Sequence, residues 1–178
     1  MMSIGAVSAQ EHAIDAAKSS MTVQVYKSGV FSAFGHDHEI SAPIASGTVN
    51  TAAGRVALHI NASSLRVRDP QASDKDRSEI QKTMQGAEVL DSEHYPEISF
   101  RSTGAEPAGT DSWRVRGDLT LHGQTHPVMV EVRKKGEHYI GVAPFKQTDF
   151  GIKPVKVAGG AVRVKDQVRI EFDIQLGG

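Results

Sequence analysis

The sequence lacks cysteine, so neither a disulfide nor a thiolate metal site is available to this chain. It also lacks an excess of charge: 20 basic and 21 acidic residues give a net charge of -1, and the longest basic run is 133–135. Because nucleic-acid binders concentrate positive charge on one surface, this balance argues against a nucleic-acid partner. No apolar run approaches the roughly 20 residues that span a bilayer as a helix, and we therefore predict no membrane span. A length of 178 residues favours a single domain.

What the sequence does contain is strict alternation of apolar and polar residues. In residues 168–176 every even position is apolar and every odd position is polar or charged. Successive side chains on a β-strand point to opposite faces, so this pattern predicts a strand with one buried and one solvated face. The same pattern recurs at 56–60, 116–121 and 128–132. Many such strands joined by short turns predict an all-β fold, an eight-stranded antiparallel barrel with one helix packed beside it.

Turn-forming residues delimit the expected elements. We expect a first strand at 21–25 and a hairpin around Gly123 and Gln124. Residues 38–49 are predicted to form one strand, in which Pro43 marks a bulge or an edge. The remaining expectations are loops at 105–111 and 149–160, a strand at 138–146, and a turn near 165–167 within the last segment.

One segment lacks the alternation and has the features of a helix. Ser73 precedes Asp76 by three residues, which resembles a capping box. Ile80 and Met84 are four residues apart and therefore share a helix face. With Gly86 as the stop, we predict a helix over residues 74–85 that turns a narrow apolar stripe toward the barrel.

The sharpest polar cluster is His36-Asp37-His38. Imidazoles two positions apart on an extended strand lie on the same side and are able to share a metal ion. A third ligand is then required, for which His122 and His126 are candidates. The alternative is that both histidines form hydrogen bonds that stabilise a turn at the barrel rim, and we favour this structural role. No nucleophile motif is present, so we predict neither catalysis nor a cofactor.

The apolar faces of the strands define a candidate lipid-binding site. An eight-stranded barrel either fills its own interior or holds one small ligand, and the alternation does not separate a plain core from a ligand cavity. The side chains expected to face this interior are Val23, Leu58, Ile60, Ile80, Met84, Phe100, Leu119, Leu121, Ile140 and Phe172.

From about residue 13 to residue 176 the sequence resembles the YceI-like family of lipocalin-like proteins. The resemblance rests on several short segments in a characteristic order: Asp15, 45–49, 61–65, 95–100, 117–123 and 148–152. It implies an antiparallel barrel with a helix beside it, an apolar tunnel for isoprenoid or fatty-acyl amphiphiles, and export to the periplasm or beyond. It implies no catalytic residues.

These observations lead to one functional hypothesis. We expect residues 12–178 to form a single YceI-like barrel domain that binds a long-chain amphiphilic lipid as a carrier, storage or protective protein. Residues 1–11 are expected to be a flexible tail or the remnant of a signal peptide, because 7–9 has the small residues of a cleavage site. The alternative is a metal-binding protein or enzyme that uses His36 and His38, and a homodimer is left open.

Overall fold

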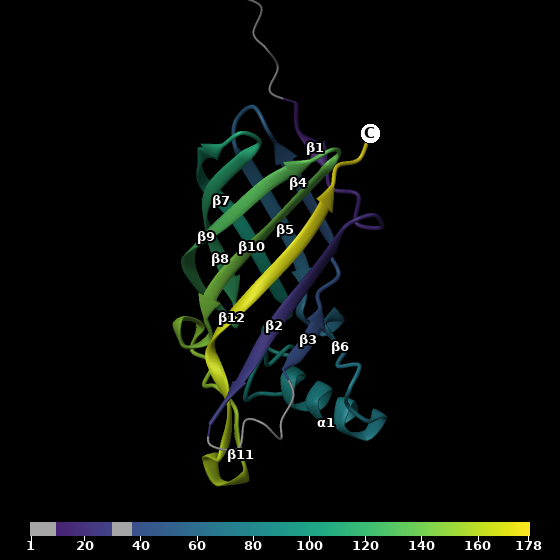
Figure 1. Ribbon diagram of the computed structural model, residues 1–178, viewed down its shortest axis with the longest axis vertical. Helices are drawn as coiled ribbons and strands as arrows, with labels where there is room; N and C mark the ends of the chain where they lie inside the picture. Colours follow the sequence, from purple (N-terminus) through teal and green to yellow (C-terminus); the bar gives the residue numbers. More distant parts are fainter. Residues whose placement is uncertain (1–9, 30–36) are drawn as a thin grey trace, which may run out of the picture.

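In the described part of the chain, one antiparallel sheet curls around a common interior, with a single α-helix beside it (Figure 1). The structure is a computed structural model that describes residues 10–29 and 37–178. In these residues the sheet has twelve strands, and its order is β1-β4-β5-β7-β8-β9-β10-β12-β2-β3-β6, with β11 paired to β12 alone. The antiparallel all-β architecture with one helix is thus confirmed, whereas the predicted count of eight strands is wrong. The strands are β1 (His12–Ala13), β2 (Ser20–Ser28), β3 (His38–Ser41), β4 (Ser46–Asn50), β5 (Arg55–Asn61), β6 (Arg66–Val67), β7 (Glu97–Gly109), β8 (Ser112–Leu121), β9 (Gln124–Lys135), β10 (His138–Lys146), β11 (Lys156–Val157) and β12 (Val162–Gln175).

The segment expected as one strand at 38–49 is two strands at opposite ends of the sheet order. β3 pairs with β2, whereas β4 pairs with β5 and β1. The four residues between them carry the chain from one end of the sheet to the other, and Ala42 and Ile44 are buried there. Pro43 fits this crossing because it has no N–H to donate to a strand partner. An isolated bridge between Ile14 and Leu176 also joins the β1 side of the sheet to the end of β12.

The turn expected near 165–167 is a bulge in one long strand. β12 is continuous from Val162 to Gln175, and its register with β2 shifts between Val164 and Val168. The bulged residues bind the 3-10 helix η3 (Gln147–Phe150). The backbone carbonyl oxygen of Lys165 accepts a hydrogen bond from the Gln147 side-chain amide. The Asp166 carboxylate accepts two from Thr148, at 2.9 and 2.7 Å. The extra residues therefore hold η3 in place without ending the strand.

The expected loop at 149–160 is only partly irregular. It contains the end of η3, strand β11 and the short 3-10 helix η4 (Ala158–Gly160). The prediction of a loop at 105–111 is wrong, because β7 continues to Gly109 and forms a long hairpin with β8. The hairpin between β8 and β9 is confirmed. Its turn residues are His122 and Gly123, both with positive φ, as a type I′ turn requires.

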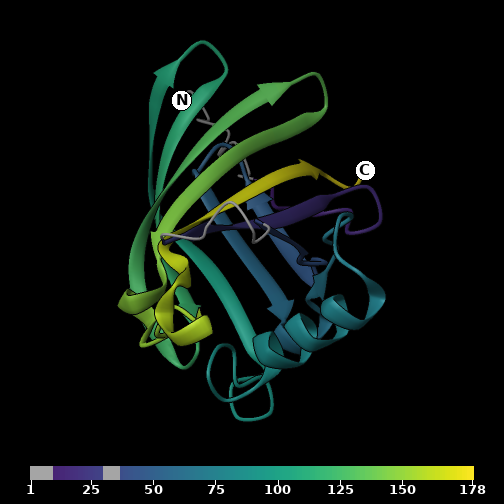
Figure 2. The same ribbon diagram turned by 60° about the horizontal axis from the view of Figure 1, so that its bottom comes forward.

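The predicted helix is confirmed at the predicted residues, α1 (Asp74–Gln85). The Ser73 hydroxyl accepts a hydrogen bond from the Asp76 N–H at 3.1 Å, which satisfies one of the free donors at the helix start. Met84 is buried, and the Gln81 side chain bonds the backbone of Val67 and of Leu65 in the β6 segment. These contacts fix the helix against one end of the curled sheet (Figure 2).

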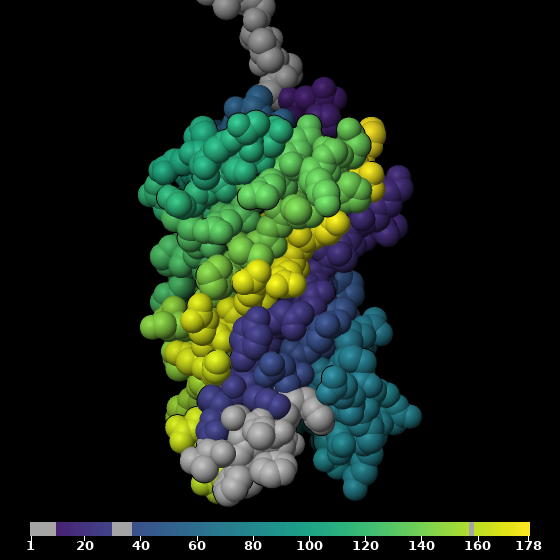
Figure 3. Space-filling model, in the orientation of Figure 1, coloured from purple at the N-terminus to yellow at the C-terminus, as the bar shows by residue number. Residues whose placement is uncertain are grey.

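The two ends of the curled sheet differ. The hairpin tips of β4–β5, β7–β8 and β9–β10 gather at one end, at the top of Figure 1, while α1 and β11 lie at the other. Side chains of β10, β12 and β2 form a continuous outer surface between the two ends (Figure 3). The larger apolar cluster runs through the interior, and its members at the helix end include Leu65, Met84, Leu90, Leu121 and the fully buried Phe150.

Two glycines bring aromatic rings onto the inner wall between these ends. A Cβ atom at Gly117 would overlap the ring of Phe100, and one at Gly141 would overlap both the Phe172 ring and the carbonyl oxygen of Glu131. Each ring therefore occupies the space that a side chain on the neighbouring strand would need. Close packing of this kind makes the inner wall intolerant of added atoms.

We predict that Gly141→Ala lowers the free energy of unfolding by about 1–3 kcal/mol, because the new methyl group meets backbone that has no room to move. The matched control is Gly104→Ala in β7, where a Cβ atom would meet no heavy atom within 4 Å, and we expect a change below about 0.5 kcal/mol there. Urea denaturation of both variants measures the difference. Equal stability of the two variants would contradict the packing described for the inner wall.

Candidate ligand-binding cavity

An apolar cavity of about 180 Å³ lies inside the curled sheet. Its wall is built from the inward-facing residues of strands β2, β4, β5, β7, β8, β9, β10 and β12. Among the described residues of the wall, Asn50, Thr51 and Ser99 alone contribute a polar side chain that is not aromatic. The interior is therefore hollow in one part.

Half of the predicted interior residues line this cavity, and the others lie elsewhere. Leu58, Ile60, Phe100, Leu119 and Phe172 are part of its wall. Val23, Ile80, Met84 and Leu121 face inward too, but they pack in or against the apolar cluster at the helix end. They stabilise the filled end and do not reach the cavity.

The prediction that Ile140 faces the interior is wrong. In register, Ile140 is paired with Arg133 of β9 and with Asp173 of β12, which belong to the outer row of the sheet. It lies in a groove on the outer surface together with Glu131 and Arg169. Its neighbour Tyr139 lines the cavity, as do Ala143 and Phe145 of the same strand.

Phe150 packs behind the cavity wall at the helix end. Its side chain has no exposed surface, and its ring meets the rings of Phe145 and His126 edge to face at centroid distances of 5.3 and 5.4 Å. Phe145 itself lines the cavity, so the Phe150 ring supports its floor. Sequence reasoning missed Phe150 because it lies in a segment without alternation.

The opposite end of the cavity is its mouth, between the hairpin tips. Trp113 of β8 and Tyr139 of β10 line the cavity here, with ring centroids 6.3 Å apart. The ammonium group of Lys134 lies 5.9 Å from the centroid of the Tyr139 ring, within the range of a cation–π contact. None of these three residues was predicted as part of the site. The alternation of β9 could have indicated Lys134, because it follows Val128, Val130 and Val132 on the inward face of that strand.

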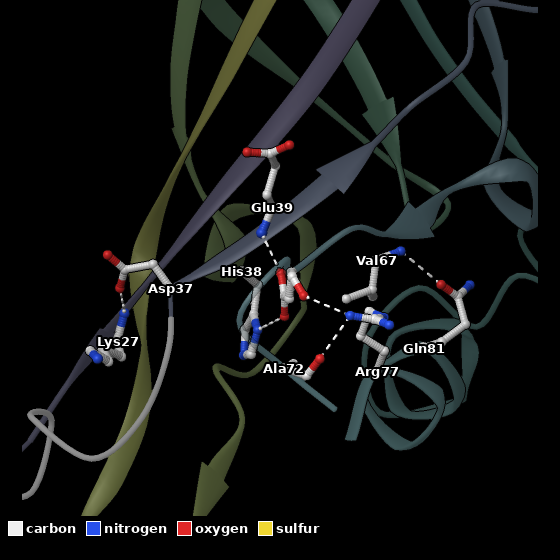
Figure 4. A network of polar contacts seen from close by, with 9 residues as sticks. Lys27, Asp37, His38, Glu39, Val67, Ala72, Arg77 and Gln81 are labelled. Atoms are coloured by element: carbon white, nitrogen blue, oxygen red, sulfur yellow. Dashed lines mark hydrogen bonds and ion pairs between the residues drawn. The ribbon is translucent and has the colours of Figure 1, made fainter. Parts of the chain in front are cut away.

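The histidine cluster belongs to a different site, next to α1. Nδ1 of His38 lies 2.6 Å from the carboxylate of Asp69, which is buried, and that carboxylate also accepts a hydrogen bond from the Glu39 N–H at 2.7 Å. Arg77 donates to the backbone carbonyls of Asp69 and Ala72, which joins the helix to the same network (Figure 4). Asp37 bonds the backbone N–H of Lys27 at 3.0 Å.

A metal site at this position stays a prediction. His36 lies outside the described residues, and no group of three His, Asp or Glu side chains within metal-binding distance occurs in the residues that the structure describes. His122 and His126 flank Phe150: Nδ1 of His122 lies 3.1 Å from the Phe150 carbonyl oxygen, and the His126 ring packs on the Phe150 ring. Their present contacts are structural.

A further histidine has a shifted pKa but lies on the exposed connection after α1. A hydrogen bond to the Asp91 carboxylate, together with its negative charge, raises the pKa of His94 above its ordinary value. His94 does not line the cavity.

No helix in residues 10–29 or 37–178 combines the length and hydropathy required to cross a bilayer.

Comparisons with known proteins agree with this architecture. The YceI-like domain family matches residues 12–176, and the chain belongs to this family. A UPF0312 protein of Vibrio cholerae (strain M66-2) is 30% identical over 124 residues, which cover 64% of this chain and 64% of that protein. A UPF0312 protein of Shewanella sp. (strain MR-4) is 26% identical over 160 residues, 83% of this chain and 80% of that protein. The chain thus spans less than two thirds of the Vibrio relative.

Solved structures share the fold at low sequence identity. The crystal structure of Burkholderia cenocepacia BcnA matches with a TM-score of 0.64 at 22% identity, over 93% of this chain and 99% of that one. The Campylobacter jejuni YCEI protein matches with a TM-score of 0.53 at 14% identity, over 78% and 81%. These likenesses extend the family assignment to the arrangement of the strands.

We predict that Asp69→Ala lowers the free energy of unfolding by about 1–3 kcal/mol, because it leaves the Glu39 N–H without its buried acceptor. Asp118→Ala is the control. Asp118 is an exposed aspartate on β8, and its removal is expected to cost less than about 0.5 kcal/mol. Thermal and urea denaturation compare the two variants. A stable Asp69→Ala variant would show that the network beside α1 does not support the fold.

Proposed function

We propose that this protein binds a long-chain amphiphilic lipid of the isoprenoid or fatty-acyl type. The apolar chain occupies the cavity, and the head group lies at the mouth between the hairpin tips. The observation that carries the proposal is the apolar cavity of about 180 Å³, supported by Phe150 at one end and bordered by aromatic rings at the other. The protein's role is then carriage, storage or protection of the lipid.

The magnitudes favour an apolar chain as the main source of affinity. Burying one CH₂ group contributes about 0.8 kcal/mol, so the roughly six groups that a cavity of about 180 Å³ holds contribute about 5 kcal/mol. Association costs roughly 4–15 kcal/mol in lost translational and rotational freedom. A buried chain therefore offsets part of this cost, and the head group supplies further affinity.

The same wall supports binding without chemistry. In the described part of the chain, the lining contains no Asp, Glu, His, Lys or Arg that would serve as an acid, a base or an activated nucleophile. We therefore propose a non-enzymatic role without a cofactor.

The homodimer stays a prediction, which size-exclusion chromatography with light scattering tests.

We also propose that the protein works in the periplasm or outside the cell, on the strength of the family resemblance and of the small residues at 7–9. Fractionation of the native host, followed by detection with an antibody against the purified protein, tests this. We expect the protein in the periplasmic or secreted fraction, alongside a periplasmic marker enzyme. Recovery with a cytoplasmic marker would contradict the proposal.

We predict that Ala143→Phe weakens uptake of a fluorescent long-chain fatty-acid probe at least tenfold. Ala143 is buried in the cavity wall, and a phenyl ring there fills space that the chain needs. The control is Val142→Phe, one residue earlier on β10, whose side chain lies in the outer groove. Probe fluorescence titrations measure both variants, and circular dichroism confirms that both fold.

The outcomes separate clearly. Unchanged uptake by Ala143→Phe means that the probe binds outside the cavity, and the site is then wrong. If the folded wild-type protein takes up no probe at any chain length from about ten to twenty carbons, the lipid-binding function itself is wrong.

A further inference from the structure

Three residues near the cavity mouth carry hydrogen-bond donors. The donors are the indole N–H of Trp113, the hydroxyl group of Tyr139 and the ammonium group of Lys134, and all three belong to strands that wall the cavity. Within residues 10–29 and 37–178, no protein acceptor receives a hydrogen bond from any of them and no carboxylate pairs with Lys134. The mouth therefore offers donors for which the protein itself supplies no acceptors.

The position of Lys134 is set by the alternation of β9. Val128, Val130 and Val132 line the cavity, and Lys134 is the next residue of the same inward row. In the sheet register Lys134 is paired with Tyr139, and Trp113 with Val132, which is two residues before Lys134 in the same row. The neighbouring Lys135 belongs to the outer row. One cation thus ends an otherwise apolar row at the mouth.

Backbone and ring contacts hold this cation near the mouth. The Lys134 N–H donates to the Asp111 carbonyl oxygen at 2.8 Å, which ties the β9–β10 hairpin to the tip of the β7–β8 hairpin. The ammonium group lies 5.9 Å from the centroid of the Tyr139 ring. Lys134 is exposed, so its charge faces the water at the opening and attracts an opposite charge there.

We propose that the mouth selects amphiphiles with an anionic head group, a carboxylate or a phosphate, which Lys134 binds with help from Tyr139 and Trp113. Such a group only accepts hydrogen bonds, so it matches three donors, and its charge matches the ammonium group. A neutral alcohol gains less, and an amine is repelled. This inference rests on the proposed lipid-binding function and adds the class of head group to it.

The test compares head groups on one chain. Tetradecanoate, tetradecyl phosphate, tetradecanol and tetradecylamine compete, below their micelle concentrations and at pH 8, with a neutral fluorescent long-chain probe bound to the wild-type protein. We expect the two anions to bind about tenfold more tightly than the alcohol, a difference of about 1.4 kcal/mol, and the amine to bind most weakly. The preference falls as salt is added, since screening weakens an exposed ion pair. The tighter of the two anions identifies the head group.

Variants assign the preference to Lys134. We expect Lys134→Met to bind the acid and the alcohol equally, and Lys134→Glu to reverse the order toward the amine. Lys135→Met, which removes the adjacent outer-row cation, retains the wild-type preference.

The possible failures are distinguishable. Equal binding of tetradecanoate and tetradecanol by the wild-type protein overturns the head-group inference and leaves lipid binding intact. A preference that survives in Lys134→Met but disappears in Lys135→Met also overturns it. If no tetradecyl compound displaces the probe and the probe itself does not bind, the proposed function has failed.

Discussion

The buried ring of Phe150 determines how the interior of this protein is divided. A curled sheet of this size leaves more interior than its own strands fill, and one end is filled from outside the strands, by η3 and by α1. Phe150 contacts Phe145, which belongs to the cavity wall, so the buried ring supports that wall from the helix end. The cavity extends from there toward the hairpin tips, where Thr51, Trp113 and Tyr139 line it. The bulge in β12 contributes to this support because Asp166 holds η3 in position.

Local patterns predicted the elements better than their arrangement. The helix was predictable to the residue, because Ser73, Asp76 and Gly86 act within one or two turns. The strand at 138–146 was equally well bounded. The division of residues 38–49 was not predictable, because it depends on which strands receive β3 and β4, and those partners are distant in sequence. Pro43 marked the place without revealing that the chain crosses there from one end of the sheet to the other.

The candidate site was predictable in the same limited sense. Alternation assigns a residue to a face, and it placed Leu58, Leu119 and Phe172 correctly in the wall. Alternation does not show how far along the interior a residue lies. Leu121 was therefore expected in the cavity, although it packs in the apolar cluster near the helix. Alternation fails where apolar residues occupy both faces, as in β10, where Ile140 and Tyr139 are adjacent and only pairing with β9 and β12 decides between them.

The division between wall and mouth has a consequence for specificity. An apolar wall favours any chain that fits, because burial of CH₂ groups contributes free energy without direction. Discrimination requires groups with a defined hydrogen-bonding role, since a donor left without an acceptor in a dry site costs free energy. In this cavity the groups with charge or a strong donor gather at the mouth, on Trp113, Lys134 and Tyr139. The apolar wall thus contributes affinity in proportion to the chain length that it buries. Selection among amphiphiles of equal chain length depends on Trp113, Lys134 and Tyr139, which lie at the ends of the inward rows of β8, β9 and β10.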